Sequence, residues 1–215
     1  MIQNKWKFLA MSTLSLVMIG CDDGENLEDM QTSTAELDRL TSESVDDLNQ
    51  LIVSEGNLQE QFDATMESDT DLATLSDGSS AVFENIESRR TLMTQLEEKE
   101  AEMLANQDIL TTYEGELLDQ QEVDQVITNI DSFSEHLTTY LDAYASTLDS
   151  QENYFNGLAS DDATYEDFVD GITTINEERD SLREPLTALD TQIGELDGSI
   201  NQLRSSIEDQ LAEEE

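Results

Sequence analysis

The residue types that carry most enzyme chemistry are scarce in this sequence of 215 residues. Cys21 is its only thiol and His136 its only imidazole. One cysteine excludes a disulfide framework, and one cysteine with one histidine excludes a zinc site built from such ligands. His136 stands beside the apolar positions Phe133 and Leu137, and neither a nucleophile nor a Glu-x-x-His spacing accompanies it. We therefore interpret His136 as an ordinary flanking residue.

Carboxylates are so abundant that they point to no particular acid–base pair or metal site. The chain has 51 Asp and Glu residues, and paired carboxylates occur in every segment. Asp69, Asp71 and Asp77 fall close together, but they lack the ligand spacing of an EF-hand calcium loop. We predict that the protein is not an enzyme and has no cofactor and no dedicated metal site, with only weak association of cations.

The net charge limits the partners further. Nine Lys and Arg residues against 51 Asp and Glu residues give a net charge of −42 at neutral pH. A nucleic-acid-binding protein needs basic side chains to displace counterions from the phosphate backbone, so nucleic acid is excluded as a partner. Acidic side chains at this density repel one another, and salt screens that repulsion. We interpret the acidic, lysine-poor composition as adaptation to high salt.

The N-terminus has the form of a lipoprotein signal peptide. Lys5 and Lys7 precede the apolar stretch Phe8–Ile19, which is too short to span a bilayer. Gly20 and Cys21 follow as in a bacterial lipobox, in which the thiol receives a diacylglycerol; an ordinary signal peptide with a stray cysteine is the alternative. We expect cleavage after Gly20 and an acylated Cys21 that anchors the chain to the outer face of the cytoplasmic membrane. Cleavage removes two lysines and no acid, so the mature chain carries −44.

Apolar residues that recur three and four positions apart predict helices, and no stretch shows the strict alternation of a half-buried strand. The predicted helical segments are about 32–67, 81–118, 123–157 and 168–207. The last segment is the most regular and forms a coiled-coil seam, with a kink expected at Pro185.

The connections between these segments are short, so neighbouring helices should be antiparallel. We place one tight reversal at Asp119–Glu122 and a helix start at Thr164, where Asp167 completes a capping box. The fold class is therefore all-α, an elongated antiparallel bundle of three to four long coiled-coil-like helices. The predicted divisions are a signal peptide over 1–20, a lipidated Cys and flexible tether over 21–31, a bundle over 32–212 and an acidic tail over 213–215.

Two arginines occupy positions on the predicted apolar seams. Arg89 and Arg179 are two of only nine cations in the chain. We expect them to pair with interior acids such as Glu100 or Glu114, an arrangement that fixes helix register more than it stabilises the fold. Binding of a ligand is the alternative role.

Aromatic residues gather in the C-terminal half of the chain. Seven of the ten aromatic residues of the mature chain fall between Phe133 and Phe168. Aromatic side chains at helical spacing usually form core, and the alternative is a glycan-stacking or partner-binding end of the rod. The candidates for such partner binding are Tyr140, Tyr144, Tyr154 and Tyr165.

Several stretches together resemble the YkyA-like lipoproteins of Gram-positive bacteria, a family that carries a cell-wall-binding label. The stretches are Ile86–Arg90, Leu96–Glu100, Tyr140–Tyr144 and Tyr154–Ile175. The resemblance covers most of residues 32–210, and it implies an all-α extracytoplasmic lipoprotein without enzymatic activity.

The chain differs from the family in its charge. Members of the family are rich in Lys as well as Glu, whereas Lys99 is the only lysine of the mature chain. Binding to a cell-wall polymer would then need a divalent-cation bridge in place of basic side chains. The alternative function is that of a scaffold that binds itself or another envelope protein through the seam of residues 168–207.

Overall fold

The computed structural model describes residues 26–213. Within this range the helices are α1 (Leu27–Ser68), α2 (Ala73–Ser76), α3 (Ala81–Thr111), α4 (Gln120–Leu158), α5 (Tyr165–Ser181) and α6 (Arg183–Glu213). Residues 26–213 contain no strand. The predicted all-α fold class is therefore confirmed.

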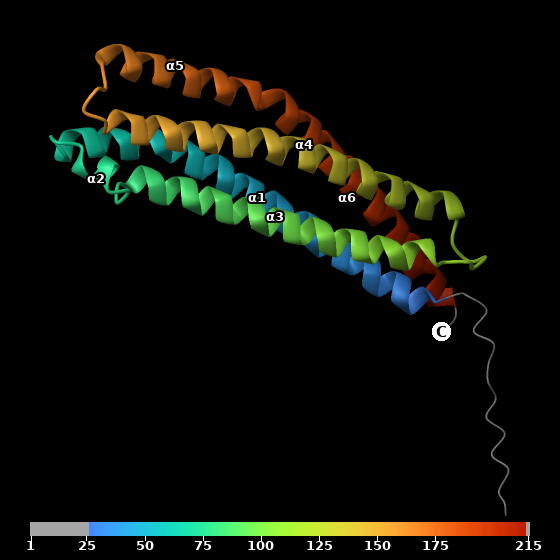
Figure 1. Ribbon diagram of the computed structural model, residues 1–215. Coiled ribbons are helices and arrows are strands. Elements are labelled where there is room, and N and C mark those ends of the chain that lie inside the picture. Colours follow the sequence, from blue (N-terminus) through green and yellow to red (C-terminus); the bar gives the residue numbers. More distant parts are fainter. Residues whose placement is uncertain (1–25, 214–215) are drawn as a thin grey trace, which may run out of the picture.

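The long helices α1, α3, α4 and α6 lie side by side in an elongated bundle (Figure 1). Helix α1 packs against α3 and α6, and α4 packs against the same two helices, so the four helices enclose one core. Successive long helices run in opposite directions along the rod. The 42 residues of α1 span about 63 Å at the helical rise of about 1.5 Å per residue. This is the elongated antiparallel bundle that the sequence predicts.

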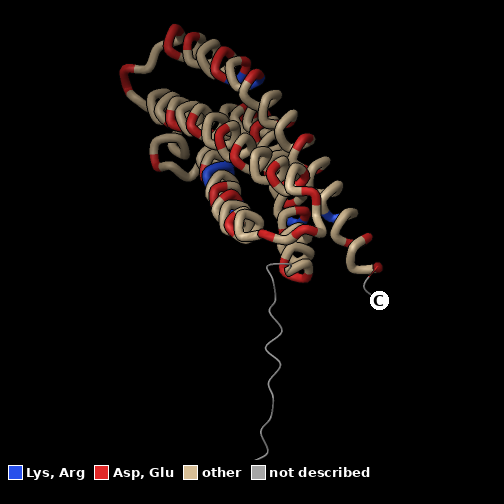
Figure 2. Tube along the Cα trace, turned by 90° about the vertical axis from the view of Figure 1, so that its right-hand side faces the viewer, with Lys and Arg blue, Asp and Glu red and all other residues tan. Residues whose placement is uncertain are grey.

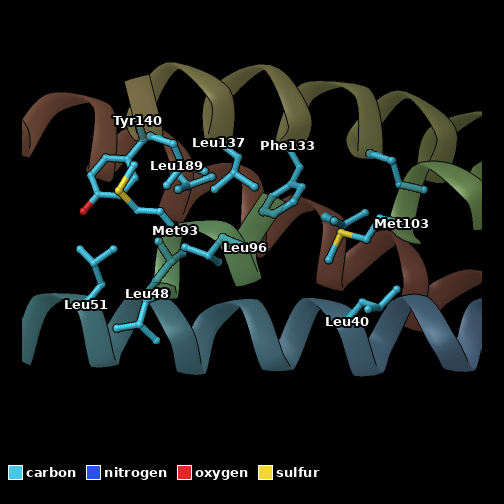
Figure 3. Close-up of a cluster of buried hydrophobic side chains, with 14 of the residues drawn as sticks. Leu40, Leu48, Leu51, Met93, Leu96, Met103, Phe133, Leu137, Tyr140 and Leu189 are labelled. Atoms are coloured by element: carbon cyan, nitrogen blue, oxygen red, sulfur yellow. The ribbon is translucent and has the colours of Figure 1, made fainter. Parts of the chain in front are cut away.

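The core is built from apolar side chains that recur every three or four positions on each helix. Leu40 and Leu51 of α1 point into the same interior as Leu96 of α3 and Phe133 of α4 (Figure 3). All four side chains are fully buried. Burial of one such side chain stabilises the fold by about 1.5–3 kcal/mol, so the apolar seams account for the association of the long helices.

The first helix begins earlier than the sequence predicts. Helix α1 starts at Leu27, so the predicted tether over 21–31 is wrong for residues 27–31. The Asn26 side chain accepts a hydrogen bond from a backbone N–H of the first turn and caps the helix. Leu27 and Met30 are buried because they extend the apolar stripe of α1 by one turn.

The outer boundaries of the chain are described only in part. Helix α6 continues to Glu213, the first residue of the predicted acidic tail. The remaining two tail residues lie outside the described residues, as do the predicted signal peptide over 1–20 and Cys21.

The connection between α3 and α4 lies earlier than predicted. Helix α3 ends at Thr111 and residues 112–119 form a loop, so the reversal is not at Asp119–Glu122. Within the loop, the backbone N–H of Leu118 donates a hydrogen bond to the Tyr113 hydroxyl at 3.0 Å, and both side chains are buried. A loop that packs its own apolar side chains against the core continues the apolar pattern of a helix, which explains the wrong boundary.

The fourth predicted segment is interrupted near its proline. Helix α5 ends at Ser181 and α6 starts at Arg183, with Leu182 between them. Pro185 has no N–H to donate to the carbonyl of Ser181, and its ring crowds that carbonyl. The kink predicted at Pro185 is thus confirmed, three residues before the proline. As a result α5 lies on the outer side of α4, while α6 passes into the bundle (Figure 1).

Helix α5 begins at the predicted capping box. The Thr164 hydroxyl accepts a hydrogen bond from the backbone N–H of Asp167 at 3.2 Å. The Asp167 carboxylate in turn accepts one from the backbone N–H of Thr164 at 2.8 Å. These hydrogen bonds satisfy two donors at the start of α5. The Thr164 hydroxyl also donates to the Asp167 carboxylate at 2.7 Å, and this bond, together with the one from the Thr164 backbone N–H, holds the pKa of Asp167 below its ordinary value.

Candidate functional site

A layer of polar side chains interrupts the apolar core beneath α5. Its members are Glu55 of α1, Arg89 of α3, Gln151 of α4 and Arg179 of α5. Each occupies a position of the seam at which neighbouring turns carry apolar residues; Glu55, for example, stands between Leu51 and Leu58. Seam positions of α1, α3 and α4 face the bundle interior, so these long helices bring Glu55, Arg89 and Gln151 together. Arg179 approaches this layer from the surface, on α5.

Arg89 lies at the centre of this polar layer. Its side chain is completely buried, and Nη2 donates a hydrogen bond to Oε1 of Gln151 at 2.6 Å. Nη1 donates to the Tyr144 hydroxyl at 3.2 Å, and Cζ lies 5.9 Å from the centre of the Tyr144 ring. The Nε atom finds no hydrogen-bond partner among residues 26–213. The guanidinium is therefore held by an amide and a phenol.

The predicted pairing of Arg89 with Glu100 or Glu114 is wrong. Glu100 accepts a hydrogen bond from Ser134 on the neighbouring helix α4. Glu114 is exposed in the loop that follows α3. Glu100 is on the same helix as Arg89, and Glu114 is in the loop just after that helix. A helix keeps residues so far apart in sequence too far apart along its axis to meet.

Tyr144 connects Arg89 to a carboxylate on α1. The Tyr144 hydroxyl donates to Oε2 of Glu55 at 3.3 Å. Oε1 of Glu55 lies 3.4 Å from Nε of Arg179, which also corrects the predicted partner of that arginine. The Glu55 side chain is 13% exposed and that of Arg179 is 64% exposed. Burial raises the pKa of Tyr144 above its ordinary range, so its hydroxyl keeps the proton that it donates.

A pocket of about 80 Å³ lies above the polar layer, between α1, α4 and α5. Its polar lining includes Glu55, Gln151 and Arg179. Its apolar wall consists of Leu58, Phe62, Tyr154, Phe155, Ile172 and Ile175. The arrangement combines charged groups of both signs with aromatic rings at one site.

Helix α5 covers this pocket. None of its residues, 165–181, is fully buried. Tyr154 of α4 holds it in place, because its hydroxyl donates to the carbonyl of Phe168 at 3.1 Å. The Tyr154 ring lies against Gly171, where a Cβ atom would come within 2.0 Å of it. Gly171 is therefore required for the close approach of α5 to α4.

The four candidate tyrosines lie in different environments. Tyr140 and Tyr144 are buried, with ring centres 5.6 Å apart, so these two tyrosines are core residues and do not form a partner-binding surface. Tyr154 is half-buried in the pocket wall. Tyr165 is 81% exposed at the start of α5, and its ring stacks on that of Phe168 at 6.2 Å. The structure thus brings Tyr144 and Tyr154 to the candidate site and leaves Tyr165 at the surface.

The other chemistry-bearing residues have local partners. Nδ1 of His136 lies 2.7 Å from the carbonyl oxygen of Ser132 on the same helix. In the connection around α2, hydrogen bonds from Thr74 hold the pKa of Asp69 below its ordinary value. Residues 26–213 contain no group of three or more His, Cys, Asp and Glu side chains that could hold a metal ion. Across the same range no helix has the length and apolar character that a membrane span requires.

Acidic residues cover the whole length of the rod, and basic residues are few (Figure 2). Most of the cations pair with carboxylates of neighbouring helices. Lys99 lies 2.5 Å from Asp47, an ion pair that is largely buried. Arg204 of α6 lies 2.6 Å from Asp38 of α1. The few cations thus join helices to one another, and they leave the exposed surface predominantly anionic.

The seam proposed for association with another coiled coil is already occupied. On α6 five seam residues are completely buried inside the bundle, Leu189, Leu196, Ile200, Leu203 and Ile207, and the seam residues Leu186 and Ile193 are half-buried against the core. On α5 the seam residues Phe168, Ile172 and Ile175 pack against the core and are half-buried. Association through this seam would require the bundle to open.

Glu55, Gln151 and Gly171 are site residues that the sequence reasoning did not single out. A signal for the first two exists, since each is a polar residue at a position where the apolar seam requires a large apolar one. Gly171 gives a similar signal, because a glycine next to the apolar seam of α5 allows another helix to approach closely.

The chain matches the model of a known family. The family model of YkyA, described as "Putative cell-wall binding lipoprotein", matches residues 25–206. Neither the curated proteins nor the solved structures give a significant match.

Proposed function

The chain belongs to the YkyA family, and from this premise we propose that it is a non-enzymatic lipoprotein of the cell envelope that associates with the cell wall. The observation that carries the proposal is the family match, which extends over nearly the whole helical bundle. The bundle supports a binding role because its surface is a long, charged rod.

In this proposal the lipid on Cys21 anchors the chain to the outer face of the cytoplasmic membrane. Five residues separate Cys21 from Leu27, the start of α1. Even fully extended, they reach roughly 20 Å, so the rod begins close to the headgroups. The C-terminal end of α6 lies at the same end of the rod as the start of α1, and α2 lies at the opposite end (Figure 1). The end with α2 would then project into the wall zone.

The rod would meet wall polymers through divalent cations. The surface is strongly acidic and lacks the lysines that could bind polymer phosphates directly. A divalent cation shared between a surface carboxylate and a polymer phosphate removes the repulsion between two anionic groups. Many weak contacts of this kind along a rod sum to a useful affinity, because each further contact is intramolecular.

Fractionation of cells that produce the Cys21→Ser variant tests the anchor. Two or three acyl chains hold a protein on a membrane durably, at about 0.8 kcal/mol per buried CH₂. The wild-type protein should remain with the membrane, and the variant should be released. A membrane fraction that is unchanged in the variant would show that Cys21 is not the anchor.

A further inference from the structure

We propose that the pocket beneath α5 binds a small zwitterion. Its ammonium group would lie between Glu55 and the aromatic wall, and its carboxylate would lie on Arg179. This site is separate from the proposed wall contacts, which involve the outer surface of the rod.

The two partners of the ion pair between Glu55 and Arg179 differ in their exposure to solvent. Glu55 is 13% exposed and is fixed by the Tyr144 hydroxyl, whereas Arg179 is 64% exposed and its ion pair with Glu55 joins Nε to Oε1 at 3.4 Å. Within residues 26–213 the Arg179 guanidinium donates no hydrogen bond, and its one ion pair is the one with Glu55. A guanidinium binds a carboxylate best through two parallel hydrogen bonds, so Arg179 has this capacity available.

The pocket that Glu55 lines has three aromatic rings in its apolar wall. The ring of Phe62 lies 5.2 Å from that of Phe155 and 6.3 Å from that of Tyr154, and all three rings line the pocket. An organic ammonium group gains from contact with the faces of such rings, most strongly where water is excluded. A carboxylate next to aromatic rings is a combination that suits an alkylated ammonium group.

The charges of the polar layer favour a ligand with both signs. The buried guanidinium of Arg89 reaches Glu55 through Tyr144, and Arg179 approaches Glu55 from the other side. A ligand with only a positive charge would therefore bring a third cation to one carboxylate. A ligand with only a negative charge would be repelled by Glu55. A zwitterion replaces the contact between Glu55 and Arg179 with a better partner for each.

The size of the pocket limits the ligand. About 80 Å³ is open to molecules of the size of water, and one water needs about 10–15 Å³ of such space, so the pocket holds roughly five to eight non-hydrogen atoms. Its floor includes Gln151, which is 1% exposed and is fixed by Arg89.

Three related compounds test the proposal by ligand-observed NMR at constant ionic strength. Glycine betaine carries both charges, choline carries only the ammonium, and 3,3-dimethylbutanoate has the shape of betaine without the positive charge. We expect saturable binding of betaine, with choline and 3,3-dimethylbutanoate at least about tenfold weaker. No saturable binding of betaine would overturn the proposal, and so would equal binding of either single-charge compound.

Variants locate the binding. Glu55→Gln and Arg179→Met should each weaken betaine binding by about tenfold or more. Arg183→Met is the matched control, since Arg183 is 80% exposed and pairs with Asp180 away from the pocket; its affinity should equal that of the wild type. Arg179 is a surface side chain, so its variant decides the matter even if Glu55→Gln fails to fold. Unchanged binding in Arg179→Met would overturn the proposal.

Discussion

Nη1 of Arg89 donates a hydrogen bond to the hydroxyl of Tyr144 at 3.2 Å, and this contact joins α3 to α4 in the middle of the bundle. The same hydroxyl donates to Glu55 on α1, so one phenol connects a buried cation to a nearly buried anion. A polar layer of this kind is satisfied in only one register of the helices. It therefore favours one alignment of the rod over alternatives shifted by a turn.

Removal of the Tyr144 hydroxyl should destabilise the bundle and reveal the coupling to Arg89. Tyr144→Phe leaves Nη1 of Arg89 without an acceptor, and we expect a loss of about 1–3 kcal/mol in the free energy of unfolding in urea. In the Arg89→Met background the same change should cost about 1 kcal/mol less, because the donor is already absent. Tyr165→Phe is the control and should change little, since this ring is 81% exposed. Additive effects of the two changes would contradict the coupling.

A methyl group at Gly171 should displace α5. In Gly171→Ala the new Cβ would lie 2.0 Å from the Tyr154 ring, which cannot retreat because Phe155 packs 5.2 Å from it. We expect a loss of about 1–3 kcal/mol in urea unfolding.

The matched control for this prediction is Gly194→Ala in α6. A Cβ at Gly194 meets nothing within 4 Å. Alanine is favoured over glycine inside a helix by about 0.5–1 kcal/mol, so this variant should be more stable than the wild type. Equal effects of the two substitutions would refute the close packing of α5 on α4.

Alkaline pH should weaken the fold through Tyr154. Burial raises the pKa of Tyr154 to about 12, whereas a tyrosine in an unfolded chain titrates near about 10. Below about pH 10 Tyr154 is protonated in both the folded and the unfolded state, and its contribution to stability is complete. Between pH 10 and 12 only the unfolded state releases the proton, so stability falls as the pH rises. The difference in tyrosinate absorbance between the wild type and Tyr154→Phe reports the titration of Tyr154. Its midpoint should lie near pH 12, and a midpoint near about pH 10 would contradict the burial.

Salt should raise the melting temperature. The mature chain carries −44, and the Debye length falls from about 10 Å at 0.1 M to about 3 Å at 1 M salt, which removes most of the repulsion between surface acids. Thermal unfolding followed by circular dichroism between low and molar NaCl measures this effect. A melting temperature that does not depend on NaCl would refute adaptation to salt.

Much of the fold could be predicted from the sequence because the apolar spacing specifies buried faces directly. Leu37 and Leu40 of α1, and Leu196, Ile200 and Leu203 of α6, are seam residues in the sequence and completely buried in the structure. The boundaries were less predictable. Leu27 and Leu118 show why: apolar side chains pack against the core whether their backbone extends a helix or forms a loop.

The candidate site could be predicted only in part. A seam position indicates that Arg89 and Tyr144 face the interior, but their partners depend on how far each helix is rotated and shifted against its neighbours. Glu55 meets Arg179 because the break at Leu182 directs α5 away from the path of α6. That angle depends on three-dimensional packing, and no local spacing encodes it.

Sedimentation with purified cell wall tests whether the rod binds the wall. The mature chain with Cys21→Ser lacks the lipid, so any association must come from the rod. We predict that it sediments with the wall in the presence of Ca²⁺ or Mg²⁺ and returns to the supernatant when a chelator is added. A rod that stays in the supernatant with and without divalent cations would contradict wall association, and binding that resists the chelator would contradict the cation bridge.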